Sequence, residues 1–272
     1  MANPLVDLGW QGPAARIEMR WPEKRNALSL AMMEALEAAL CRAAADERTR
    51  AVVLAARGPA WSAGHFLPEM VGADPGTHRR VLDACRRLMR TVQELPQPVI
   101  AEVHATATAA GCQLVAACDL AVAARGARFA TPGVRIGLFC STPMVQLSRT
   151  IGRKQSLEML LTGEFVDADK ALAWGLVNRV VDATDLEAAS QKFAERIAAA
   201  SPYVVALGKR AFYRQIAMPL DEAAGAMSAV MCGNAGEPDA QEGMRAFLEK
   251  RPPRWTQSVS RPPRPLDGRG AG

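Results

Sequence analysis

The chain has 272 residues, of which 49% are hydrophobic and 22% are charged, and its net charge is +5. This length and composition are typical of a soluble globular protein with one full core and a helical extension. Nucleic-acid binding is not expected, because aromatic residues make up only 5% of the chain and no basic helix carries interleaved aromatics. Much of the positive charge belongs to the C-terminal end, at Arg251, Arg254, Arg261, Arg264 and Arg269.

The cysteine pattern and the N-terminal sequence indicate the expected compartment. The six cysteines form no C-x-x-C pair and no regular framework, which favours a reducing environment. The first residues lack a positive segment followed by an apolar one, so neither a signal peptide nor a transit peptide is expected. No apolar run reaches the 18 residues of a membrane span. The sequence therefore predicts a cytoplasmic protein without membrane association.

Strand and helix patterns alternate through the first half of the chain. Ala15–Trp21 alternates as a strand does, and Pro22 closes it. Ser29 is the predicted N-cap of a helix that runs to about Ala45. The next predicted elements are a strand at Ala51–Ala55, a short helix near Leu67, a helix over about His78–Glu94, a strand at Val99–Val103, a helix from about Ala110, and strands at Leu120–Ala123 and Arg128–Ala130. This alternation predicts an α/β fold with layered sheets.

The second half reads as mainly helical. Ser201 is a predicted cap, with Pro202 at the helix position that tolerates a missing N–H. The predicted elements are helices at Met144–Ile151, Lys154–Leu161 and Asp167–Trp174, a strand at Leu176–Val181, and helices at about Leu186–Ala200, Pro202–Ile216, Leu220–Cys232 and Asp239–Lys250. The segment Pro252–Gly272 is rich in proline, glycine and arginine, a composition typical of a flexible tail.

Two stretches of small residues organise the chain, Ala60–Met70 (AWSAGHFLPEM) and Ala101–Leu120 (AEVHATATAAGCQLVAACDL). In each, an apolar strand stops at small residues and the chain turns into a helical segment. Such a turn leaves unpaired N–H groups at the helix start, which are donors for a developing anion. Two turns of this kind could supply two donors to one substrate oxygen. Tight packing of a helix against a sheet is the alternative reading of the same small residues.

These two stretches resemble the signatures of the enoyl-CoA hydratase/isomerase (crotonase) family, and most closely a subgroup that lacks both hydratase glutamates. The similarity extends from about Ile17 to Trp255. It includes Asn26-Ala27-Leu28, Leu161-Thr162-Gly163-Glu164, Ala171-x-x-x-Gly175-Leu176-Val177 and Glu242-Gly243-Met244-x-Ala246-Phe247. The resemblance implies a crotonase-like spiral of ββα units over residues 1–200, a helical trimerisation region over 201–251 and a flexible basic tail over 252–272. It also implies a homotrimer or a hexamer made of two trimers.

The resemblance assigns the backbone N–H groups of His65 and Ala110 as the two oxyanion-hole donors. Three positions where the family carries catalytic carboxylates hold Gln113, Gly133 and Ser141 in this chain. Phe66 replaces the signature aspartate after the first turn. The resemblance thus implies that the two backbone donors are retained, whereas every position where it identifies a carboxylate holds a residue without one.

The lost carboxylates bear on the expected reaction. One general acid or base contributes about 10²–10⁴-fold to the rate, and one oxyanion donor contributes about 10²–10³-fold. The resemblance therefore implies a protein that acts on acyl-CoA thioesters through an enolate-like intermediate, with weak ordinary hydration. Two alternatives stay open: a non-catalytic acyl-CoA binding protein, and a decarboxylase or thioesterase of the same family. No metal or covalently bound cofactor is expected, and the CoA thioester is the ligand.

Several other polar residues are candidates for the missing acid–base group. The His65 imidazole has a near-neutral pKa by type, or His65 serves only the turn conformation. Glu102 and His104 share one face of an apolar strand and form a candidate buried pair, or a structural or subunit contact. Glu69 is read as a solvated helix residue, and Cys140, beside Ser141, has no neighbouring base in the sequence.

The resemblance also identifies residues for binding the CoA ligand, and the basic charge balance suits such a polyanion. Lys250 matches a position that reaches a nucleotide held by a neighbouring subunit, although a lysine near a helix C-terminus is favourable in any protein. The implied set is Arg25, Ala27, Leu28, Ala63, Gly64, Gly111, Phe247 and Lys250.

Overall fold

The computed structural model describes residues 5–259, which form two β-sheets and a set of packed helices. The strands are β1 (Val6–Gln11), β2 (Ala14–Met19), β3 (Ala51–Ala56), β4 (Ala60–Ser62), β5 (Val99–Val103), β6 (Thr106–Thr108), β7 (Leu120–Ala124), β8 (Arg128–Ala130), β9 (Val166–Asp167) and β10 (Arg179–Val181). The α-helices are α1 (Leu30–Ala45), α2 (Pro75–Glu94), α3 (Ala110–Ala117), α4 (Ser141–Thr150), α5 (Arg153–Thr162), α6 (Ala168–Trp174), α7 (Leu186–Ala198), α8 (Pro202–Gln215), α9 (Leu220–Ala235) and α10 (Pro238–Leu248).

The strands are shared between the two sheets in a repeating order. The larger sheet runs β1-β2-β3-β5-β7-β10 and the smaller one β4-β6-β8-β9. In the three pairs β3–β4, β5–β6 and β7–β8, the first strand joins the larger sheet, the second joins the smaller one, and a helix follows; β9 and β10 reverse this order and have α6 between them. The chain therefore turns as ββα units, which confirms the predicted crotonase-like α/β spiral. The pairings are parallel apart from β1 with β2 and β8 with β9.

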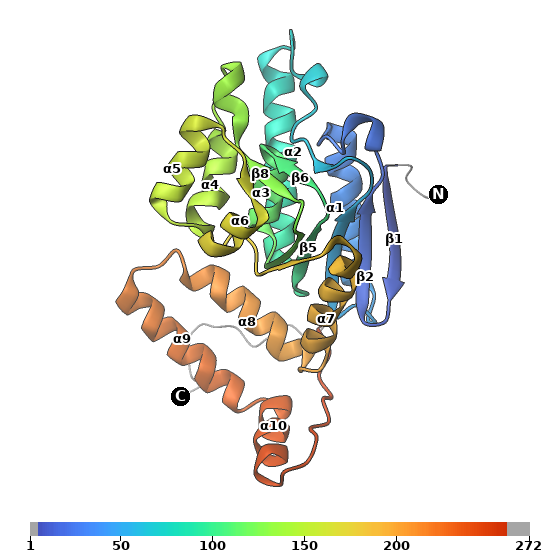
Figure 1. The fold of residues 1–272 in the computed structure, drawn as a ribbon. Coiled ribbons are helices and arrows are strands. Elements are labelled where there is room, and N and C mark those ends of the chain that lie inside the picture. Colours follow the sequence, from blue (N-terminus) through green and yellow to red (C-terminus); the bar gives the residue numbers. More distant parts are fainter. Residues whose placement is uncertain (1–4, 260–272) are drawn as a thin grey trace.

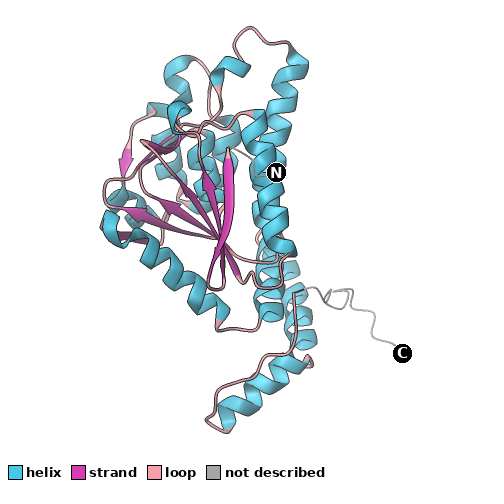
Figure 2. Cartoon of the chain, turned by 90° about the vertical axis from the view of Figure 1, so that its right-hand side faces the viewer, coloured by secondary structure: helices cyan, strands magenta, loops and turns pink. Residues whose placement is uncertain are grey.

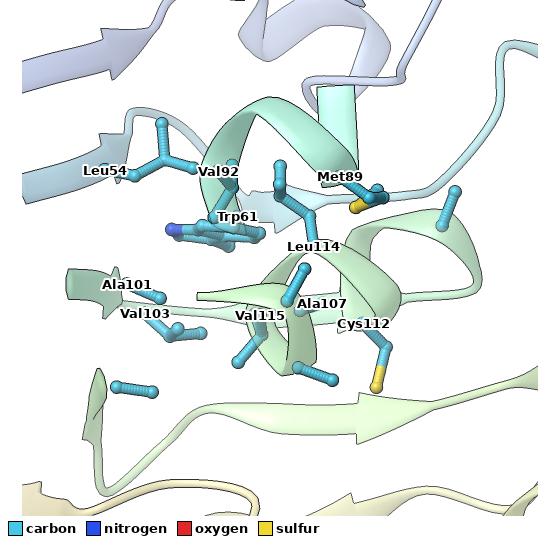
Figure 3. Close-up of a cluster of buried hydrophobic side chains, with 14 of the residues drawn as sticks. Leu54, Trp61, Met89, Val92, Ala101, Val103, Ala107, Cys112, Leu114 and Val115 are labelled. Atoms are coloured by element: carbon cyan, nitrogen blue, oxygen red, sulfur yellow. The ribbon is translucent and has the colours of Figure 1, made fainter. Parts of the chain in front are cut away.

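The main core lies between the larger sheet and the helices α1, α2 and α3 (Figure 1). Side chains of a strand alternate between its two faces, so Val52 and Leu54 of β3 join this core while Val53 faces α7 on the other side. Figure 3 shows Trp61 of β4 packed with Leu54 and with side chains of α2 and α3. Burial of these side chains fixes the end of β4 against the start of α3.

The C-terminal helices extend from one end of the α/β core (Figures 1 and 2). A buried polar group fastens α8 to this core: Lys209 Nζ lies 2.6 Å from Asp119 Oδ2 and donates to the carbonyl oxygens of Val92 and Gln97. The hydroxyl of Tyr213 donates to Asp119 Oδ1 at 2.9 Å. All three hydrogens of the ammonium group are therefore engaged, and α8 is held in one position.

Most predicted elements are confirmed, and four strands were missed. The Ser29 hydroxyl accepts from Met32 N and caps α1 as predicted, and the Ser201 hydroxyl caps α8. The sequence analysis missed β1 and the two-residue strand β9, and it missed β4 and β6, which have three residues each and fall within the stretches interpreted as small-residue turns. The strand predicted at Leu176–Val181 is shorter, because Leu176 and Val177 lie in the core loop before β10.

The start of the predicted flexible tail is packed on the C-terminal helices. Trp255 Nε1 donates to Ala199 O at 2.8 Å, and the backbone N–H of Thr256 donates to Asp239 Oδ1 at 2.8 Å. Gln257 is 7% exposed and its side chain accepts from Asp239 N. Residues 252–259 thus differ from the expectation of flexibility, because buried Asp239 anchors them. The rest of the predicted tail, 260–272, lies outside the described residues.

Candidate functional site

The ends of β4 and β6 lie side by side and bring the two small-residue turns together. The strands are parallel, with Ser62 opposite Ala107. Gly64 adopts a φ of 84°, and a Cβ there would lie 2.8 Å from Ala109 Cβ and 3.1 Å from Ala110 N. A Cβ at Gly111 would lie 2.6 Å from Ser62 O. Only glycine allows this approach, so the small residues serve to place two backbone turns in direct contact.

Two backbone N–H groups at this contact have no protein acceptor. Within residues 5–259, the hydrogen bonds of the two turns use the N–H groups of Leu28, Phe66 and Ala109 but not those of His65 and Ala110. Ala110 is the first residue of α3, and no side chain caps this helix. Unsatisfied N–H groups at a helix start carry partial positive charge. The two adjoining turns therefore leave one N–H group each, those of His65 and Ala110, without a protein acceptor among the described residues.

The imidazole of His65 is buried beside this pair of donors. Both ring nitrogens are sealed from solvent, and neither makes a well-formed hydrogen bond among the described residues, although the nearby backbone of Leu28 partly opposes the effect of burial on the pKa. Burial lowers the pKa of His65 below its ordinary value because the charged form loses its hydration. The next residue, Phe66, stacks against Trp21 with ring centroids 5.1 Å apart. Phe66, at the position where the resemblance implies an aspartate, thus makes an aromatic contact.

Gln113 lies one turn along α3 from Ala110 and is 5% exposed. Its Oε1 accepts a hydrogen bond from the Cys85 thiol of α2 at 3.9 Å. Burial raises the pKa of Cys85 to about 12, so this thiol remains a protonated donor near neutral pH. Because an amide has no accessible pKa in water, Gln113 cannot take a proton as a carboxylate would.

Gly133 lies in a tight turn that has no room for a side chain. A Cβ at this position would lie 2.0 Å from Leu138 O and 2.8 Å from Cys140 Sγ. The Cys140 thiol is buried, and burial raises its pKa. Ser141 is exposed at the start of α4, and its hydroxyl lies 3.5 Å from Phe139 O. None of these groups is close to a base in the described hydrogen bonds, so no activated nucleophile is formed here.

The candidate pair of Glu102 and His104 is not formed. Glu102 accepts a bidentate hydrogen bond from Arg16 at 2.9 and 2.7 Å and a further one from Ser190 Oγ at 2.5 Å. His104 Nε2 is hydrogen-bonded to Gly58 O at 2.9 Å instead. Glu102 faces α7, on the side of the sheet away from the main core. The candidate carboxylate–imidazole pair is therefore absent, and this carboxylate joins the sheet to α7, in line with the structural alternative.

Glu69 has a structural contact that the sequence reading missed. Its Oε2 accepts from the backbone N–H of Leu30 at 3.0 Å, the first residue of α1. A carboxylate at a helix start is favoured by the helix dipole. Glu69 is thus a partner of α1 and not a solvated helix residue.

The segment Arg25–Leu28 is held beside the first turn by a buried amide. Asn26 donates to the carbonyl oxygens of Arg57 and Ala60 and accepts from Trp21 N. Leu28 N donates to Gly64 O at 2.7 Å, and Ala63 N donates to Arg25 O at 3.0 Å. The side chain of Leu28 is fully buried, whereas Arg25 and Ala63 are exposed. Of the residues assigned to ligand binding here, these two present surface to a ligand.

Phe247 and Lys250 are not brought to this site within one chain. They lie at the end of α10, which projects away from α3 (Figure 1). Phe247 is 82% exposed. Any contact of these residues with the site therefore requires another copy of the chain.

The structure places other features that the sequence reading missed. Ala109 adopts φ 50° and ψ −119°, a strained conformation for a residue with a Cβ. The buried group of Asp119, Lys209 and Tyr213 was also missed, because its members are far apart in the sequence. Within residues 5–259, no helix is long and apolar enough to cross a membrane, and no cluster of histidine, cysteine and acidic side chains could hold a metal.

Fold and site together define an α/β protein of the crotonase type, with two convergent strand-to-helix turns. The enoyl-CoA hydratase/isomerase family profile matches residues 11–258, and the chain belongs to this family. A Xenopus laevis relative, "Enoyl-CoA hydratase domain-containing protein 3, mitochondrial", is 47% identical over 94% of this chain and 87% of its own.

Two solved structures show the same fold. An enoyl-CoA hydratase structure from Mycobacterium smegmatis has a TM-score of 0.90 and 48% identity, and the match covers 93% of this chain and 99% of that one. The structure of human enoyl-CoA hydratase domain-containing protein 3 has a TM-score of 0.89 and 42% identity, over 92% and 100% of the two chains. These matches confirm the crotonase-like fold along nearly the whole chain.

The comparisons correct the expected location. The relatives from Xenopus laevis, Rattus norvegicus and Homo sapiens, which are 45–47% identical, are all named as mitochondrial proteins. This finding contradicts the cytoplasmic expectation. That expectation relied on charge and hydropathy near the N-terminus, which are weak indicators of destination.

Proposed function

We propose that this protein binds an acyl-CoA thioester and stabilises its enolate through the backbone N–H groups of His65 and Ala110. The observation that carries the proposal is the direct contact of the two turns, which leaves both donors without a protein acceptor. Membership of a family that acts on CoA thioesters supports it. Preorganised donors stabilise a developing oxyanion by about 3 kcal/mol each.

The polar groups of the site do not favour ordinary enoyl-CoA hydration. Hydration needs a group that takes a proton from water, and Gln113 cannot do so. Gly133 carries no side chain, and Ser141 has no base beside it. Loss of two acid–base groups lowers the rate by about 10⁴–10⁸-fold. We therefore place this protein among acyl-CoA-binding members with weak hydratase activity.

The CoA part of the ligand is assigned to the rim of the first turn and to a neighbouring copy. Arg25 and Ala63 are exposed there, and the backbones of Ala27, Leu28 and Gly64 hold the rim in place. Gly111 keeps the second turn close to Ser62. Phe247 and Lys250 would approach the nucleotide from a second subunit of a trimer or of a hexamer, because they project away from the site of their own chain.

The test is a calorimetric titration of the protein with crotonyl-CoA, followed by an absorbance assay for loss of the enoyl double bond. We expect binding with little turnover. Infrared spectra with a ¹³C-labelled thioester carbonyl then report the two donors directly, and the bound carbonyl is expected at a lower frequency than the free one. Fast hydration would contradict the argument from Gln113 and Gly133, and an unshifted carbonyl would contradict the oxyanion assignment.

A second candidate function is a reaction that requires little acid–base help. The paired donors without a carboxylate would suit decarboxylation, in which loss of CO₂ generates the enolate without proton abstraction, or thioester cleavage. A protein that binds acyl-CoA without turnover has the same site. Screening of malonyl-CoA and saturated acyl-CoA esters for product separates these alternatives.

A further inference from the structure

The amide of Gln113 is fixed in one orientation by Cys85. A protonated thiol donates one hydrogen, and its acceptor here is Gln113 Oε1. The neighbouring group thus determines which end of the amide faces α2. Cys85 is 1% exposed within the main core, so this contact is held in place by packing.

The other end of the amide remains available. Gln113 Nε2 has no hydrogen-bond partner within residues 5–259, and the atom is not sealed from solvent. Its two hydrogens therefore face space that solvent can reach. At the position where the family carries an acceptor, this chain presents a donor.

The distance along α3 relates this donor to the proposed thioester site. Ala110 and Gln113 are three residues apart in one helix, so they lie on the same face about 5 Å apart. A thioester oxygen bound at Ala110 N–H places the third carbon of the acyl group within reach of Gln113. Gly133 supplies no carboxylate, because no side chain fits at that position.

We infer that Gln113 Nε2 donates a hydrogen bond to a carbonyl oxygen on C3 of the acyl group. The ligand class is a CoA thioester with a ketone or a carboxylate at this carbon. This inference rests on the proposed function and adds the chemistry of the acyl part. A saturated or an enoyl chain offers no acceptor there and leaves the amide donor without a partner once solvent is displaced.

The test compares the dissociation constants of acetoacetyl-CoA, malonyl-CoA and butyryl-CoA by calorimetry. We expect one of the two oxygenated esters to bind about two- to tenfold more tightly than butyryl-CoA, the effect of one hydrogen bond. Preference for acetoacetyl-CoA identifies the ketone as the acceptor, and preference for malonyl-CoA identifies the carboxylate. Equal binding of all three esters overturns the inference and leaves the proposed function intact.

Variants of Gln113 assign the preference to this residue. Gln113→Leu is expected to remove the preference, because the oxygenated ester loses its donor and butyryl-CoA no longer leaves a buried amide unpaired. Gln113→Glu replaces the donor by an acceptor of similar shape and is expected to weaken binding of the oxygenated ester below that of butyryl-CoA. A preference that persists in both variants would overturn the inference.

A cysteine variant tests the orienting contact. Cys85→Ala removes the thiol donor and frees the amide to turn. The ratio of the dissociation constants of butyryl-CoA and the oxygenated ester should therefore fall to about its square root or lower, while the dissociation constant of butyryl-CoA stays the same. Cys41→Ala is the matched control, because Cys41 is exposed on α1 and should leave the preference unchanged. If no CoA ester binds to the unmodified protein, the proposed function fails and this inference fails with it.

Discussion

Ala109 holds a backbone conformation that residues with a Cβ rarely adopt, with φ at 50° next to the proposed donor of Ala110. Strain of this kind is retained where surrounding structure imposes it and is concentrated at functional sites. Here the imposing contacts are Ala109 N to Ala130 O at 2.9 Å and Gln113 N to Ala109 O at 3.0 Å. The turn geometry therefore has an energetic cost, which a substitution at Ala109 can measure.

We predict that Ala109→Gly stabilises the protein by about 1 kcal/mol, because glycine adopts a positive φ without steric strain. The measurement is the free energy of unfolding from urea titration. Ala38→Gly is the control, since Ala38 is exposed within α1 and glycine in a helix interior lowers stability by about 1 kcal/mol. Destabilisation by both substitutions would show that Ala109 is not strained.

A second prediction at the residue scale concerns the pH dependence of stability. Burial lowers the pKa of His65 in the folded protein, so the unfolded chain binds the proton more strongly. The contribution of His65 is then fully present above its unfolded pKa of about 6.5 and is lost as the pH falls through the lower folded value. Between pH 7 and pH 5, His65→Phe should lose less stability than the unmodified protein.

Urea titrations across this pH range measure the difference. Equal slopes for His65→Phe and the unmodified protein would contradict a neutral, buried His65.

At the scale of elements, α8 is held to the core by the ion pair of Lys209 and Asp119, whose side chains are only 6% and 14% exposed. Removal of one partner from a buried pair leaves an uncompensated charge. We predict that Lys209→Met lowers the free energy of unfolding by about 3–5 kcal/mol and speeds hydrogen exchange in α8.

The exposed pair of Lys170 and Glu158 provides the control for this prediction. Its N–O distance of 2.7 Å is nearly the same, but the side chains are 44% and 46% exposed. Lys170→Met should therefore change stability by less than about 1 kcal/mol. Similar losses for the two lysine substitutions would show that burial does not determine the strength of the Lys209 contact.

The elements differ in how far the sequence predicted them. α1 was predicted with its cap because Ser29 and the apolar spacing are local signals. β5 was predicted with its bounds because Pro98 precedes it and its first three residues are apolar. β4 and β6 were missed because three residues give too short a pattern to read. The contact of Glu102 with Arg16 and Ser190 joins positions up to 88 residues apart, and alternation along one strand cannot reveal it.

The candidate site was assigned in the sequence through its small residues and through the resemblance to the enoyl-CoA hydratase/isomerase family. Gly64 and Gly111 appear in the sequence as small residues, and the structure gives their physical role, which is close approach of two turns. The orientation of Gln113 could not be predicted, because it depends on Cys85, which is 28 residues away. Local sequence patterns therefore indicate where the backbone turns of the site lie, whereas the orientation of its side chains depends on packing.

At the scale of the whole molecule, the C-terminal helices leave large apolar side chains uncovered. Leu220 is 83% exposed, Phe247 is 82% exposed and Leu248 is 79% exposed. These residues lie on α9 and α10, which project from the core (Figure 2). Exposed apolar surface on one projecting region is typical of a subunit contact, which agrees with the proposed trimer or hexamer.

We predict that the double substitution of Phe247→Ser and Leu248→Ser shifts the protein from an oligomer to a monomer in sedimentation velocity at micromolar concentration. Each apolar side chain contributes about 1.5–3 kcal/mol when it is buried, so the loss of two weakens each subunit contact by about 10²–10⁴-fold. Val71→Ser is the control, because Val71 is 81% exposed in the loop before α2 and should leave the mass unchanged.

The monomer should also bind acyl-CoA more weakly than the oligomer, since Lys250 would no longer reach a neighbouring site. A monomer with unchanged acyl-CoA affinity would show that the site is complete within one chain.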